Sequence, residues 1–92
     1  MMTVIDLEQK EKCLKICDKL FENGYIFEVS NHDRQEDYPY INVMTKYGMI
    51  KDSELIELFR KNGFECFKSD LVIILYFERE VENLSAEECF SI

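Results

Sequence analysis

The pattern of apolar and polar positions divides the chain into two similar halves. Apolar residues recur every three or four positions over residues 6–22, and again from a capping residue at Asp52 or Ser53 onward, which is the spacing of an amphipathic helix. Both stretches end in Asn-Gly, at residues 23–24 and 62–63, and a glycine at the end of a helix readily adopts the left-handed cap conformation. The sequence therefore predicts two helices that end in the same type of cap.

Two strand-like segments follow each predicted helix. These segments are residues 25–30, 40–47, 64–68 and 71–80. Alignment of the two caps places Tyr25 over Phe64 and Phe27 over Cys66, so we expect these four side chains to point toward the core. The predicted order of elements is α-β-β-α-β-β.

Two such units close most simply into an α+β sandwich of two layers, in which a four-stranded antiparallel sheet carries both helices on one face. This αββαββ arrangement resembles a circularly permuted ferredoxin-like fold with the strand order 3-4-2-1. The order requires the fourth strand to be central, and the unbroken apolar run Leu71–Phe77 predicts a strand that is buried on both faces. Glu28 and Glu65 suit edge strands. A short helical turn is expected to begin at Ser85.

Length and composition indicate one domain over residues 1–92. The chain is 47% apolar and has three glycines and one proline, so it can bury a single core. We find no secretion signal and no apolar run of membrane-spanning length, and we therefore expect a soluble cytoplasmic protein whose four cysteines are reduced.

The negative charge is concentrated near the end of the chain. The formal net charge is −8, and residues 70–92 carry six acids against the single base Arg79. Such a surface repels phosphate backbones and anionic lipid, and it attracts basic partners. The charge therefore argues against direct binding to nucleic acid or membranes and favours a basic protein partner.

The residues that could carry chemistry do not form a site in the sequence. Cys13 and Cys17 are one helical turn apart, but structural zinc usually needs a second close pair, so we expect both to pack in the core. The side chains of Ser30 and His32 diverge within so short a segment, and Cys66 is expected to be buried. We therefore predict no catalytic residue, metal or cofactor, and a protein that is not an enzyme.

Two acidic segments are candidates for binding a partner. Three alternating glutamates share one face of the last strand, either as a solvated strand end or as an acidic ridge. The long connection before residue 40 combines acids with tyrosines, and it is either a mobile loop or part of an interface. The predicted partner-binding residues are Asp33, Glu36, Asp37, Tyr38, Tyr40, Glu78, Glu80 and Glu82.

The open face of the predicted sheet is too apolar to remain in water, so we expect residues 82–92 or a second copy of the chain to cover it. The leading hypothesis is an inhibitor of a basic, nucleic-acid-binding enzyme such as a nuclease. Its size, charge and single domain are typical of phage anti-defence proteins, including the anti-CRISPR type, and of toxin-immunity proteins. The alternative is a homodimeric structural or small-ligand-sensing domain that uses the open sheet face.

Overall fold

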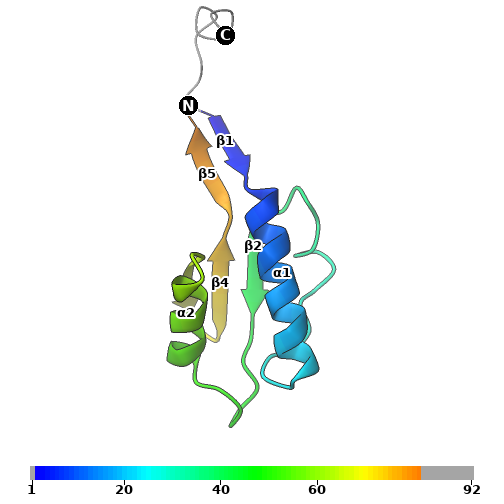
Figure 1. Cartoon of the computed structure of the whole chain (residues 1–92), viewed down its shortest axis with the longest axis vertical. Coiled ribbons are helices and arrows are strands. Elements are labelled where there is room, and N and C mark those ends of the chain that lie inside the picture. Colours follow the sequence, from blue (N-terminus) through cyan, green and yellow to red (C-terminus); the bar gives the residue numbers. More distant parts are fainter. Residues whose placement is uncertain (1, 82–92) are drawn as a thin grey trace, which may run out of the picture.

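The computed structural model describes residues 2–81 and has an α+β fold with two antiparallel sheets (Figure 1). The elements are β1 (Met2–Ile5), α1 (Leu7–Glu22), β2 (Tyr40–Val43), α2 (Asp52–Lys61), β3 (Glu65–Ser69), β4 (Val72–Tyr76) and β5 (Glu78–Val81). One sheet has three strands in the order β2-β4-β3, and β1 pairs with β5 in a separate two-stranded ribbon. The α+β class with two helices is confirmed. The predicted four-stranded sheet is not present in these residues, and the ferredoxin-like arrangement is not confirmed. The helical turn predicted at Ser85 lies outside them.

The two helix caps have the same geometry, as the repeated Asn-Gly predicts. Gly24 and Gly63 both have a positive φ, +80° and +87°. In each cap the residue after the glycine donates its N–H to the helical carbonyl five positions earlier, which is the bond of a Schellman motif. The two bonds run from Tyr25 N to Leu20 O, 2.9 Å, and from Phe64 N to Phe59 O, 3.0 Å.

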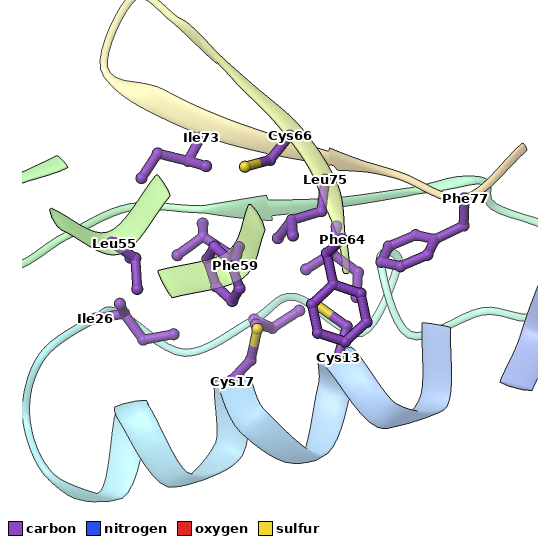
Figure 2. Close-up of a cluster of buried hydrophobic side chains, with 13 residues drawn as sticks. Cys13, Cys17, Ile26, Leu55, Phe59, Phe64, Cys66, Ile73, Leu75 and Phe77 are labelled. Atoms are coloured by element: carbon purple, nitrogen blue, oxygen red, sulfur yellow. The ribbon is translucent and has the colours of Figure 1, made fainter. Parts of the chain in front are cut away.

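Both helices contribute to one hydrophobic core on the same face of the three-stranded sheet (Figure 2). α1 contributes Cys13 and Cys17, and α2 contributes Leu55 and Phe59; all four side chains are fully buried. The sheet contributes alternate residues from each strand. These are Ile41, Val43, Cys66, Ile73 and Leu75, with Phe64 and Phe77 at one end.

β4 is the central strand, as predicted, but only one of its faces is buried. Ile73 and Leu75 point into the core and are at most 1% exposed, whereas Val72, Ile74 and Tyr76 on the other face are half-buried. The prediction of a doubly buried strand is therefore wrong for the described residues. The run is continuous because the other face of β4 also carries apolar side chains, which form part of the open surface of the sheet.

The segment after α1 makes one isolated bridge in place of the predicted strand. Ile26 pairs with Thr45, and the chain then leaves the sheet. Further along the edge of β2, the backbone N–H of Asn42 donates to the carboxylate of Asp33 at 2.8 Å. A side chain thus occupies the place where the backbone of a fourth strand would have paired.

The inward face of this segment is also opposite to the prediction. Ile26 is fully buried, whereas Tyr25 and Phe27 are 37% and 52% exposed. The cause lies in the helices, because α2 has one more residue than α1 between its Leu-Phe pair and its Asn-Gly cap. Phe59 is therefore buried while its counterpart Phe21 is 39% exposed, and the chain leaves each helix at a different rotation.

The predicted last strand is divided in two at Phe77, where the chain changes its hydrogen-bonded partner. The N–H of Phe77 donates to Pro39 at 2.8 Å, and its carbonyl accepts from the N–H of Asp6 at 2.9 Å. β5 thereby leaves the three-stranded sheet and pairs with β1. β1 was not predicted, because its four residues show no clear alternation of apolar and polar positions.

The start of α2 differs from the predicted cap at Asp52 or Ser53. The capping residue is Lys51, whose side chain makes no capping bond, and Asp52 is the first helical residue. The carboxylate of Asp52 accepts from Thr45 Oγ1 at 2.6 Å and forms an ion pair with Lys68 at 2.8 Å. The contact with Lys68 has the larger effect and the hydrogen bond from Thr45 the smaller, and together they hold the pKa of Asp52 below its ordinary value. The pair connects the start of α2 to β3.

The cap geometry predicts that Gly63→Ala lowers the free energy of unfolding by about 1 kcal/mol, because alanine is strained at positive φ. No atom lies within 4 Å of the added Cβ, so the backbone alone causes the loss. Urea unfolding measures the change, with the exposed Glu57→Ala in the middle of α2 as a control that should change stability by less than about 0.5 kcal/mol. An equal stability of Gly63→Ala and wild type would contradict the cap.

The Asp52–Lys68 pair predicts a specific pH dependence. Because the pKa of Asp52 is lower in the folded than in the unfolded state, its contribution is fully present above the unfolded value of about 4 and is lost as the pH falls through the folded value. Asp52→Asn should therefore be less stable than wild type by about 0.5–1 kcal/mol near pH 6, with a smaller difference near pH 3. Urea unfolding at both pH values measures this. Lys68→Met should cause a similar loss, and adding it to Asp52→Asn should cost little more; a pH-independent difference would contradict the pair.

Candidate protein-binding surface

The face of the three-stranded sheet that points away from the helices carries rows of side chains that cross the strands. Strand register defines the rows, and their polarity changes along the face. The rows are Glu65–Tyr76–Tyr40 next to β5, then Phe67–Ile74–Asn42, and finally Val72 beside Met44 and Phe27 near the β3–β4 turn. The end near β5 is aromatic and acidic, and the opposite end is apolar.

Four rings form a continuous aromatic row from the loop of residues 31–39 onto the sheet. The ring centroids of His32 and Tyr38 are 4.2 Å apart, those of Tyr38 and Tyr40 are 5.5 Å apart, and those of Tyr40 and Tyr76 are also 5.5 Å apart. The structure thus brings together Tyr38 and Tyr40, which the sequence predicted, with Tyr76, which it missed. Tyr76 was not predicted to bind a partner because it lies within the apolar run Leu71–Phe77. It alternates with the buried residues Leu75 and Phe77, so its side chain lies on the opposite, open face of the sheet.

Three carboxylates surround the sheet end of this row. Glu65 lies opposite Tyr76 in the register, and Glu78 and Glu80 follow Tyr76 at alternate positions. Burial and then the charge of Glu78 raise the pKa of the Tyr76 hydroxyl, with further contributions from Glu65 and Glu80. Between residues 2 and 81, no Lys or Arg forms an ion pair with these three glutamates. Glu82 lies outside the described residues.

A buried lysine holds the loop that supplies Tyr38. Lys10 of α1 is only 2% exposed, and its ammonium donates to the carbonyl oxygens of Gln35, at 2.5 Å, and Tyr38. Its Nζ also lies 5.7 Å from the centroid of the Tyr38 ring. Burial lowers the pKa of Lys10, and the negative charges of Asp33 and Asp37 oppose this effect. This role of Lys10 was not predicted, because a lysine is rarely buried without a partner and its partners here are backbone carbonyl groups, which every residue carries.

Asp33 also stabilises the loop and is not part of the exposed surface. It is 4% exposed, and one carboxylate oxygen accepts from the backbone N–H and the side-chain amide of Asn42, at 2.8 and 3.1 Å. Its own N–H donates to Ser30 Oγ at 3.2 Å. The neighbouring acids Glu36 and Asp37 are exposed. Of the acids predicted in this loop, these two can meet a partner, whereas the Asp33 carboxylate is used inside the fold.

The loop's arginine is paired with the helix. Arg34 Nη2 lies 2.5 Å from Asp18 Oδ1 of α1, and this hydrogen bond raises the pKa of Arg34. Lys10 and Arg34 therefore attach the loop to α1 at two points, while Asp33 attaches it to β2. The aromatic row begins on a loop that is fixed on both sides.

Cys13, Cys17 and Cys66 are part of the core, as predicted. Cys13 and Cys17 are fully buried, and the hydrogen bond between them and their burial raise the pKa of the Cys13 thiol. Burial likewise raises the pKa of Cys66, so its thiol is protonated at neutral pH. No group of three or more candidate metal ligands comes together in the part of the chain that the structure describes.

Comparisons with protein-family models, curated proteins and solved structures each gave no significant match. Neither helix within residues 2–81 has the length and apolar character needed to cross a bilayer. A functional assignment therefore depends on the chemistry of this surface alone.

The loop contacts predict that Lys10→Met lowers the free energy of unfolding by about 2 kcal/mol, because it removes two hydrogen bonds from a charged donor to the loop backbone and leaves the Tyr38 carbonyl without this donor. Urea unfolding measures the loss, and NMR chemical shifts should change in the Tyr38 and Tyr40 rings. Lys15→Met, an exposed substitution on the same helix, is the matched control and should change stability by less than about 0.5 kcal/mol. Equal effects of the two substitutions would show that Lys10 does not hold the loop.

Proposed function

We propose that this protein is a small, non-enzymatic module that binds a basic protein through one surface. We call it the tyrosine–acid surface and define it as Tyr38, Tyr40, Tyr76, Glu65, Glu78 and Glu80. The observation that carries the proposal is the row of three tyrosine rings that ends beside carboxylates without a basic partner among residues 2–81. Glu36 and Asp37 extend the negative charge at the loop end of the row.

The chemistry of this surface suits arginine and lysine side chains. A cation gains energy over the face of a tyrosine ring, and a carboxylate next to the ring can accept a hydrogen bond from the same group. Tyrosine is also enriched in protein interfaces because it offers a large contact area with few rotatable bonds. Lys10 and Asp33 hold the loop end of the row, so little conformational freedom remains to be lost on binding.

The charge suggests the class of partner. At a net charge of −8 the protein repels nucleic acid and is attracted to proteins that bind it. A nuclease or another nucleic-acid-binding enzyme has such a basic groove, and occupation of the groove would inhibit it. This is the action of phage anti-defence proteins, including the anti-CRISPR type, and of toxin-immunity proteins, and we propose a cytoplasmic role of this kind.

A second candidate function uses the other end of the open sheet face. Phe27, Met44 and Phe67 are 52%, 42% and 49% exposed. Exposed apolar side chains gathered on one face favour burial against a second copy of the chain or a small apolar ligand. This alternative describes a homodimeric or ligand-sensing domain in which the glutamates play no part.

Charge reversal distinguishes the two functions. The double substitution Glu78→Lys/Glu80→Lys should reduce capture of a basic partner from a lysate of the native host at least tenfold. The reason is that the glutamates would no longer attract the basic partner or speed its association with the protein. The matched control is Glu8→Lys/Glu11→Lys on α1, where Glu8 is already paired with Lys12 at 3.4 Å. Capture is quantified by mass spectrometry, and circular dichroism checks that both variants are folded.

The control should retain most of the captured partner, and capture by wild type should fall as salt is raised, since screening shortens to about 8 Å at physiological ionic strength. Equal capture by wild type and the Glu78→Lys/Glu80→Lys variant would contradict the proposed function. A dimer that Phe67→Glu separates, combined with no effect of either charge reversal, would favour the second candidate.

A further inference from the structure

β5 has one open edge. Its one hydrogen-bonded neighbour among residues 2–81 is β1. The bond from Asp6 N to Phe77 O shows that the backbone groups of Phe77 face β1. Every second residue of β5 faces the same way, so the backbone groups of Arg79 and Val81 also face β1. The N–H and C=O groups of Glu78 and Glu80 therefore point to the opposite side, away from β1.

No described strand lies on that side of β5. β3 covers this side of β4 only as far as Glu65, which is opposite Tyr76, and the chain before Glu65 turns back toward α2. A hollow lies where β3 ends and β5 continues, and its lining includes Gly63, Phe64, Glu65 and Glu78. Figure 1 shows β5 extending beyond α2.

The outer edges of the three-stranded sheet are protected, unlike β5. Asn42 on β2 donates its N–H to Asp33 at 2.8 Å, and Arg60 of α2 donates to the carbonyl of Cys66 on β3 at 3.0 Å. Such covering is the usual defence of edge strands against unwanted pairing. A two-stranded ribbon of four residues per strand is only marginally stable in water, so a third strand would add both pairing and stability.

We propose that β5 is a docking edge for an extended, basic segment of the partner protein, which pairs with the backbone of Glu78 and Glu80 and continues the line of β3. This inference rests on the proposed function and specifies its mode of binding as strand addition. Lys or Arg at alternate positions of the added strand would lie beside the Glu78 and Glu80 side chains, which share one face.

The same charges disfavour pairing of β5 with the β5 of a second copy of this chain. Antiparallel pairing of β5 with another β5 places glutamates opposite or diagonal to glutamates, and like charges across a strand pair are destabilising. The outer edge of β1 carries Thr3 and Ile5, which are uncharged, and offers no complement to a basic strand. The chemistry therefore selects a basic partner segment on β5.

The experiment uses the full chain and three capped octapeptides: alternating Lys-Thr, the same peptide with alternate backbone nitrogens methylated, and alternating Glu-Thr. Amide hydrogen exchange is measured by NMR. Saturating Lys-Thr peptide should slow exchange at Glu78 and Glu80 at least tenfold and leave Thr3 and Ile5 unchanged. The methylated peptide cannot complete the ladder and the Glu-Thr peptide is repelled, so neither should slow exchange.

Two substitutions at one position separate charge from backbone pairing. Glu80→Gln removes the charge and should weaken binding of the Lys-Thr peptide several-fold. Glu80→Pro also removes the N–H that points away from β1 and should weaken binding at least tenfold more than Glu80→Gln. Unchanged protection of the Arg79 amide in the proline variant confirms that the β1–β5 ladder is intact.

Three results would overturn strand addition. The first is protection of the Glu78 and Glu80 amides in the free protein, which would mean that the chain already covers this edge. The second is no slowing at Glu78 and Glu80 with the Lys-Thr peptide, and the third is equal effects of the Lys-Thr and methylated peptides. If partner capture remains sensitive to Glu78→Lys/Glu80→Lys in any of these cases, the proposed function stands without this mode of binding; if it does not, both fail.

Discussion

The candidate surface depends on one buried ammonium group. Lys10 lies on the buried stripe of α1, one and two helical turns before Cys13 and Cys17, and its ammonium donates to two carbonyl groups of the loop at residues 31–39. A buried charge is costly unless polar groups surround it, and here the loop backbone and the nearby carboxylates of Asp33 and Asp37 supply them. The loop is thereby held in one position against α1, and the aromatic row begins in this loop.

Fixing this loop also determines the shape of the sheet. The Asp33 carboxylate accepts the hydrogen bond of the Asn42 N–H on the outer edge of β2. No fourth strand is needed to pair with this N–H, and the segment after Ile26 leaves the sheet. The face opposite the helices then remains open in the described residues and displays Tyr40 and Tyr76 beside the acids that follow them. The fold thus places an aromatic and acidic surface next to a strand, β5, that has an unpaired edge.

Patterns that depend on neighbouring residues could be predicted from the sequence, and those that depend on distant contacts could not. The Asn-Gly caps, the helical stripes with Cys13 and Cys17, and the central position of β4 follow from local spacing and apolar content. The missing fourth strand could not be foreseen, because the competing bond from Asn42 to Asp33 joins residues nine positions apart through a side chain. In the candidate surface, Glu78, Glu80 and two tyrosines were predicted from the local sequence. The positions of Tyr76 and Glu65 on this surface follow only from the register of the sheet, and the buried role of Asp33 follows only from its bond to Asn42.

The buried Lys10 ammonium holds the loop at which the tyrosine–acid surface begins. NMR of the lysine side-chain ammonium groups tests it most directly, through their proton exchange, their titration and their contacts. We predict that the Lys10 ammonium exchanges slowly with water, has a pKa below the ordinary value of 10.5, and shows nuclear Overhauser contacts to the Tyr38 ring. A Lys10 signal that exchanges and titrates like an exposed lysine, without contact to Tyr38, would contradict it.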